Sequence, residues 1–201
     1  MQRLIRQRRL SVPLIIIALL TACEAPVKSS GMIASEIPDA LFPEDPSLLS
    51  AIGVGTVQGG KIDDLLARAT ISDDDLRTAI IRSLDRQGLL ASDQPRYRLD
   101  VQLADAEQGL TELLFGLDIT VVARIAYTLT DTQSNRPGSV ERVESRGTTR
   151  SQDYFNQGER SRVAAERAIG NNIQEFLNRL FSRPATETSG QTFDQTSEPS
   201  E

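Results

Sequence analysis

The chain lacks the side chains on which much enzyme chemistry depends. It has no histidine, no tryptophan and a single cysteine in 201 residues. The absence of histidine excludes Ser-His-Asp and Cys-His catalysis, histidine-ligated zinc and the usual general base near neutral pH. One cysteine excludes a disulfide within the chain, so its stability has to come from an apolar core. With 4% aromatic residues and no tryptophan, the chain offers fewer aromatic side chains than sites that stack sugars or bases typically use.

The start of the chain has the pattern of a secretory signal peptide. Four arginines within the first nine residues precede an apolar run over 12–20 that only Pro13 interrupts. A basic start, a short apolar core and small residues before a cleavage site are typical of such signals. The run is shorter than the about 20 apolar residues that a membrane-spanning helix needs.

The signal ends in Leu20-Thr21-Ala22-Cys23. This tetrapeptide resembles the lipobox of bacterial lipoproteins, in which the signal is removed immediately before a cysteine. The resemblance implies a signal peptide over 1–22, and lipid on the sulfur and the amine of Cys23. It also accounts for the unpaired cysteine of an exported chain.

Removal of the signal makes the chain strongly acidic. Without the four arginines, 18 basic side chains remain against 28 acidic ones, a formal net charge of −10. Such a balance argues against a nucleic acid partner, and against attachment of the protein surface to anionic lipid. We therefore expect the membrane contact to come from the acyl chains on Cys23, because two or more chains hold a protein firmly.

Composition divides the rest of the chain into three parts. Residues 23–47 are predicted to be the lipidated N-terminus and a tether rich in proline and serine. A flexible stretch of that length reaches roughly 25–30 Å. Residues 48–183 are predicted to form one folded domain, and 184–201 a disordered acidic tail.

Periodicity within the domain predicts an α+β fold. Apolar side chains recur every two residues in three stretches, which is typical of strands. In two other stretches they recur every three or four residues, which is typical of helices, and Ser72 is a candidate helix cap. The expected order is β-α-β-β-β-α, a two-layer sandwich of a mostly antiparallel sheet with both helices on its apolar face. The expected strands span 49–57, 97–103, 117–129 and 140–150, and the expected helices 72–88 and 157–181.

In the third expected strand, the residues that alternate with the apolar ones form the more polar side and are our candidate for a partner face. Many of them are small or β-branched, and such side chains suit a flat contact. A second candidate is a patch for lipid or lipopolysaccharide phosphate, formed by Arg142, Arg146 and Arg150 with Arg160 and Arg162. The alternative for these arginines is a solvated strand edge and helix start. The partner-face candidates are Asp118, Thr120, Val122, Arg124, Ala126 and Thr128.

Other candidate sites favour structural explanations. The glycines from Gly53 to Gly60 are spaced one residue too widely for the dinucleotide fingerprint, and favour a closely packed strand and turn. The three aspartates after Ser72 suit the start of a helix better than a metal site. The only lysines, Lys28 and Lys61, lie where burial is not expected. We predict no catalytic residues, no metal, no cofactor and no enzyme activity.

Several segments of the domain carry a resemblance to a group of known proteins. They are the glycine-rich first strand and the stretches SLDRQGLL over 83–90, YRL over 97–99, FGLDITV over 115–121 and VAAERAIGNNI over 163–173. With these segments the domain resembles small envelope lipoproteins of Gram-negative bacteria that have no known activity. The element order more distantly resembles YajG-type lipoproteins and the lipopolysaccharide-assembly lipoprotein LptE.

The resemblance leads to an expected location and role. Glu24, rather than the aspartate associated with inner-membrane retention, follows Cys23, which implies the periplasmic leaflet of the outer membrane. We expect a non-enzymatic binding or scaffolding module with an envelope protein as partner. The alternative is a component of lipid or lipopolysaccharide transport or assembly.

Overall fold

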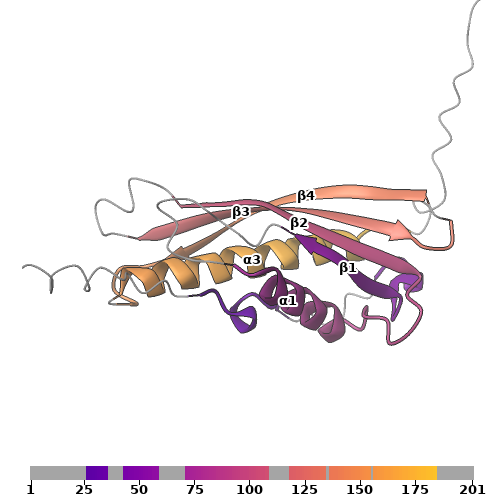
Figure 1. Cartoon of the computed structure of the whole chain (residues 1–201), viewed down its shortest axis with the longest axis horizontal. Helices are drawn as coiled ribbons and strands as arrows, with labels where there is room; N and C mark the ends of the chain where they lie inside the picture. The colour runs from indigo at the N-terminus through magenta and orange to yellow at the C-terminus, as the bar shows by residue number, and fades with distance from the viewer. Residues whose placement is uncertain are drawn as a thin grey trace, which may run out of the picture.

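In the part of the chain that the structure describes, a four-stranded sheet carries two α-helices on one face (Figure 1). The computed structural model describes residues 26–35, 43–58, 71–108, 118–134, 136–154 and 156–184. The strand order is β1-β2-β3-β4; β1 and β2 are parallel and the other neighbours antiparallel. The strands are β1 (Ile52–Gln58), β2 (Tyr97–Gln108), β3 (Ile119–Asp131) and β4 (Arg136–Thr149), and the helices α1 (Asp73–Arg86) and α3 (Gln157–Phe181).

Alternation along β3 explains why the sheet has one covered face. From Ile119 to Tyr127 every second side chain is buried toward the helices, whereas the alternate residues are half-buried. Since successive side chains of a strand point to opposite faces, one face of the sheet joins the core and the other stays open. The predicted α+β order with both helices on one face is confirmed.

The two helices begin at polar caps. The side chain of Ser72 accepts a hydrogen bond from the Asp75 amide (3.0 Å) and donates one to its carboxylate (2.6 Å). Asp73 and Asp74 lie in the same first turn, where the helix dipole favours negative charge. Asn156 caps α3 through the Gly158 amide at 2.8 Å. The three aspartates therefore lie at the start of a helix, where the sequence placed them.

A buried polar cluster ties α3 to the sheet. The amide group of Asn172 donates hydrogen bonds to the carbonyl oxygens of Ala123 (3.1 Å) and Val143 (2.8 Å), and accepts one from the Tyr127 hydroxyl (3.0 Å). The Tyr127 ring stacks on Phe176, with 4.0 Å between centroids. Burial raises the pKa of the Tyr127 hydroxyl well above its usual value, so this group is a neutral donor.

Side chains from the helices occupy the outer edges of the sheet. Arg77 of α1 donates to the Gly55 carbonyl of β1 at 2.7 Å. Asn171 and Arg167 of α3 donate to the carbonyls of Arg146 (2.9 Å) and Thr148 (2.6 Å) on β4. These contacts satisfy edge groups that otherwise invite pairing with another strand.

Residues 26–35, which we name the docked segment, cross the helix layer of α1 and α3. They contain the short 3-10 helix η2 (Ser29–Gly31), which contacts both helices. The Lys28 amide donates to the Glu166 carboxylate of α3 at 2.9 Å, and the Ala34 amide to the Ser83 hydroxyl of α1 at 3.0 Å. The buried side chains of the segment are Val27, Met32 and Ala34.

The prediction of a tether over 23–47 is therefore wrong for residues 26–35. It is also wrong for 43–47, where the Glu44 amide donates to the Phe181 carbonyl at 2.9 Å and the 3-10 helix η3 (Pro46–Leu48) begins. A few apolar side chains are enough to dock these stretches, although proline and serine dominate them. The signal over 1–22, Cys23, the glycines at 59 and 60, Lys61 and the tail beyond Pro184 lie outside the described residues.

Replacing Asn172 by leucine is expected to lower the free energy of unfolding by about 3 kcal/mol, because three buried polar partners lose their hydrogen bonds. Urea denaturation of the chain from residue 24 onward measures the change. The control is Asn171→Leu, which removes one exposed hydrogen bond and is expected to cost less than about 1 kcal/mol. Equal losses for the two variants would contradict the role given to Asn172.

Candidate functional site

The candidate site is the open side of the sheet, which we name the outer sheet face. In Figure 1 both helices lie below the sheet, and no described helix covers its upper side. The face is built from alternate residues of three neighbouring strands, brought together by the strand register. Its residues are Arg98, Asp100 and Gln102 of β2, Thr120, Val122, Arg124, Ala126 and Thr128 of β3, and Arg142, Glu144, Arg146 and Thr148 of β4.

Apart from Arg124, the side chains that β3 contributes to this face are short, so the centre of the face is low on either side of that arginine. Ala126 of β3 lies between Gln102 of β2 and Arg142 of β4, and all three face the same side. Thr120 is paired across the sheet with Thr148, and their hydroxyl oxygens are 3.1 Å apart. Longer side chains stand on both flanking strands, so a partner can approach β3 closely between them.

The charged side chains of the face are partly paired with one another. Arg124 forms an ion pair with Glu144 at 2.9 Å, and Arg146 lies 3.9 Å from the same carboxylate. Arg98 pairs with Asp100 at 2.9 Å. Exposed pairs of this kind contribute about 0–1 kcal/mol, so these arginines can exchange their partner for one on another molecule.

The structure places five of the six predicted partner-face residues on the outer sheet face. The sixth, Asp118, precedes β3, and its carboxylate accepts a hydrogen bond from the Ser151 amide at 3.2 Å. This bond joins the start of β3 to the turn after β4. Asp118 therefore has a structural contact at the end of the sheet.

The predicted arginine patch does not form as a group of five. Arg142 and Arg146 share the outer sheet face, and Arg150 follows the end of β4. Arg160 and Arg162 belong to α3, on the other side of the sheet. Arg160 is buried, at 8% exposure, and Arg162 pairs with Glu166 at 2.6 Å. Because α3 lies on the covered side of the sheet, Arg160 and Arg162 are separated from Arg142 and Arg146 on the open side.

Sequence reasoning missed the contributions of β2 and Glu144 to this face. Arg98, Asp100 and Gln102 alternate with buried residues, which was visible in the sequence, but only the register shows which residues of β3 they lie beside. The glycines of β1 are explained by the same neighbours. A side chain at Gly55 would overlap the Asp100 carboxylate, which supports close packing for that strand.

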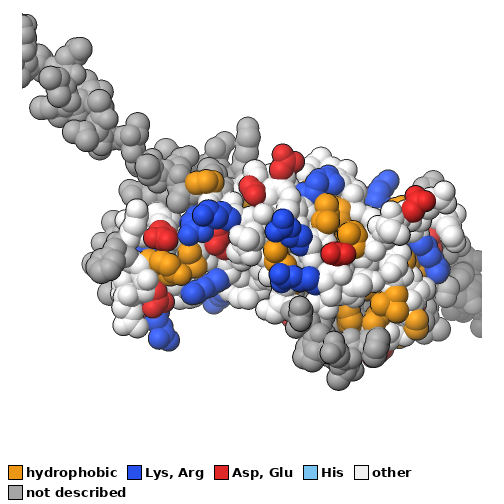
Figure 2. Space-filling view, turned by 90° about the horizontal axis from the view of Figure 1, so that it is seen from below, with side chains coloured by type: hydrophobic (Ala, Val, Ile, Leu, Met, Phe, Trp, Pro, Cys, Tyr) orange, Lys and Arg blue, Asp and Glu red, His pale blue; other side chains and the backbone are white. Residues whose placement is uncertain are grey.

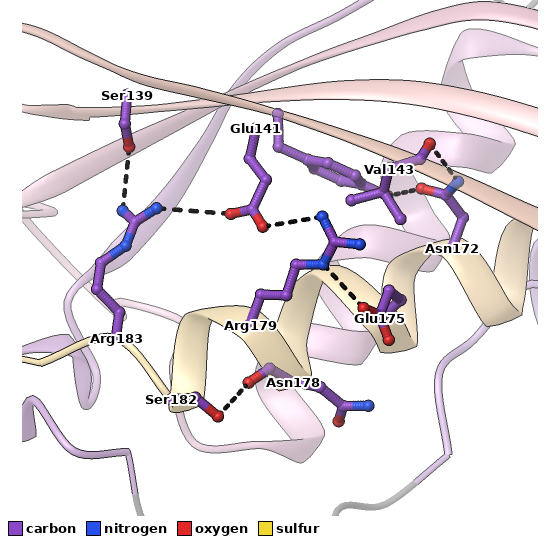
Figure 3. A network of polar contacts seen from close by, with 10 residues as sticks. Ser139, Glu141, Val143, Asn172, Glu175, Asn178, Arg179, Ser182 and Arg183 are labelled. Carbon is purple, nitrogen blue, oxygen red and sulfur yellow. Dashed lines mark hydrogen bonds and ion pairs between the residues drawn. The ribbon is translucent and has the colours of Figure 1, made fainter.

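A second polar cluster, on the helix side of β4, is fully engaged in holding α3 (Figure 3). The Glu141 carboxylate lies between Arg179 (3.4 Å) and Arg183 (3.5 Å), and Arg179 also bonds Glu175 at 2.8 Å. The hydrogen bond from Arg179 to Glu175 raises the pKa of the arginine further above its usual value. The arginines and carboxylates here are paired with one another, and the pairs hold the end of α3 against β4.

Two further properties concern only the part of the chain that the structure describes. Within it, no three histidine, cysteine, aspartate or glutamate side chains gather as a metal site would require. Its helices are too short or too polar for any of them to span a bilayer.

Similar solved structures include two proteins of low sequence identity to this chain. No family model and no curated protein matches the chain. A candidate lipoprotein from Caulobacter crescentus CB15 has 14% identity and a TM-score of 0.45, covering 67% of this chain and 91% of its own. A Xanthomonas campestris protein of the DUF330 family has 13% identity and a TM-score of 0.48, covering 70% and 90%. At these values the similarity assigns neither a family nor a function to the chain.

Proposed function

We propose that the chain is a lipid-anchored, non-enzymatic binding module of the cell envelope. The observation that carries the binding role is the outer sheet face, a flat, open surface with arginines on its flanks. The anchor is supported by the signal pattern and by Cys23 as the only cysteine. The proposed location is the periplasmic leaflet of the outer membrane, on the ground that Glu24 follows Cys23.

The chemistry of the described core favours binding over catalysis. Among the carboxylates that form ion pairs, Glu141 and Glu166 are the least exposed, and each lies beside an arginine. Both carboxylates serve structural contacts, Glu141 between β4 and α3 and Glu166 between α3 and residues 26–35. We propose an envelope protein as the partner, since the low centre and paired charges of the face suit a broad protein contact.

The anchor is tested by mass spectrometry of the protein from separated inner and outer membranes. We expect a chain that begins at Cys23 and carries acyl groups, found with the outer membrane. The Cys23→Ser variant is expected to lose the acyl mass and to leave the membrane fraction, because no described helix replaces the lipid. A wild-type chain that still begins at Met1, or that is soluble, would refute the anchor.

The binding face is tested with the double variant Thr120→Lys/Ala126→Lys. Two long, positively charged side chains at the low centre are expected to abolish capture of the partner by a photo-cross-linker at Thr128. The urea midpoint is expected to change little, because both positions point outward. The control, Ser30→Lys/Thr78→Lys, adds the same charge to the helix layer and is expected to preserve capture.

Each result of this experiment decides between the candidates. Capture that persists in the outer-face variant refutes the proposed face. A cross-linked product that is lipid or lipopolysaccharide instead of protein replaces the binding module with the transport alternative. Mass spectrometry of the product distinguishes the two.

A further inference from the structure

The docked segment begins very close to the proposed lipid. Val27 is buried at 1% exposure, and the next residue, Lys28, donates its amide hydrogen to Glu166 of α3. Only residues 24–26 separate Val27 from Cys23. Four residue steps of a fully extended chain span at most about 14 Å. Cys23 is therefore confined to within that distance of the point where the segment meets α3.

This distance decides which side of the domain the bilayer contacts. The segment lies on the helix layer, bonded to Glu166 on α3 and Ser83 on α1. A helix with its side chains is about 10–12 Å across, and the sheet lies beyond it. The chain from Val27 is too short to pass both layers and place lipid beyond the outer sheet face.

We infer that the docked segment holds the helix layer against the lipid bilayer, with the outer sheet face turned away from it. This inference rests on the proposed lipid at Cys23 and adds an orientation to the proposed function. A free tether of 24 residues would leave the domain roughly 25–30 Å from the anchor and without a fixed orientation. Docking shortens the tether to three residues.

The charges near the docked segment fit a surface of anionic headgroups. Figure 2 shows the helix side of the molecule, where lysine and arginine side chains gather among apolar and acidic ones. The exposed Lys28 lies on the segment itself, and Arg86 of α1 donates to its Ala34 carbonyl at 3.4 Å. Such cations are attracted to an anionic membrane surface. The acidic balance of the whole chain therefore does not prevent a local contact.

Gly31 provides a specific way to release the segment. A side chain at this position would overlap the Glu166 carboxylate, which also receives Arg162 and the Lys28 amide. Gly31→Val is therefore expected to undock residues 26–35 while leaving the sheet and the helices folded. Ser30→Val is the matched control, because the neighbouring Ser30 is exposed.

The experiment uses the lipidated full-length mature protein in phosphatidylethanolamine–phosphatidylglycerol vesicles. Because the sulfur of Cys23 is occupied by lipid, one new cysteine can be labelled uniquely with a fluorophore. Glu159→Cys places it on α3, on the face that carries Glu166 two turns later, and Gln102→Cys places it on the outer sheet face. Lipids with a nitroxide on the headgroup then quench a fluorophore that lies close to the bilayer.

We expect strong loss of fluorescence at position 159 and almost none at 102. Gly31→Val is expected to remove this difference, and Ser30→Val to keep it. Equal quenching at the two positions of acylated protein, or stronger quenching at 102, overturns the orientation and leaves the anchor intact. Absence of acyl mass on Cys23 overturns the anchor, and the orientation with it.

Discussion

The structure depends on a sheet that has only one apolar face. Along β3 the residues toward α3 are apolar and the alternate ones are short or polar, so helices can bury one side only. The register of α3 on that side is set by Asn172, which bonds β3 and β4 at once, and by Gly147, where a side chain would meet the α3 backbone. The position of the helices, the contact of the docked segment with α1 and α3, and the open outer sheet face all follow from this packing.

The same packing connects the chain end to the proposed function. A helix layer on one side gives the N-terminal segment a surface of apolar and hydrogen-bonding groups, with Glu166 and Ser83 as its polar contacts. The open sheet on the other side is available to a partner. In the proposed function, the anchor at Cys23, four residues before Val27, separates the two contacts, with membrane on the helix side and partner on the sheet side.

The fold was predictable because its signals are local, whereas the site depends on distant contacts. Strict alternation identified β3, and Ser72 with the following aspartates identified the start of α1. The parallel pairing of β1 and the place of Arg98 beside β3 residues needed the register. The docking of residues 26–35 escaped prediction because its partners are far away in sequence: Lys28 and Glu166 are 138 positions apart. The separation of Arg160 and Arg162 from Arg142 and Arg146 on the open side of the sheet likewise follows from layers that composition does not show.

The central claim is that residues 26–35 are part of the folded domain and do not form a free tether. Amide hydrogen exchange of the lipidated protein on vesicles tests it most directly, at the amides of Lys28 and Ala34, which donate to Glu166 and Ser83. The account predicts slow exchange at both amides, close to that of the neighbouring turns of α3 and α1, because exchange there requires the segment to undock. Exchange at the rate of an unstructured chain would contradict it.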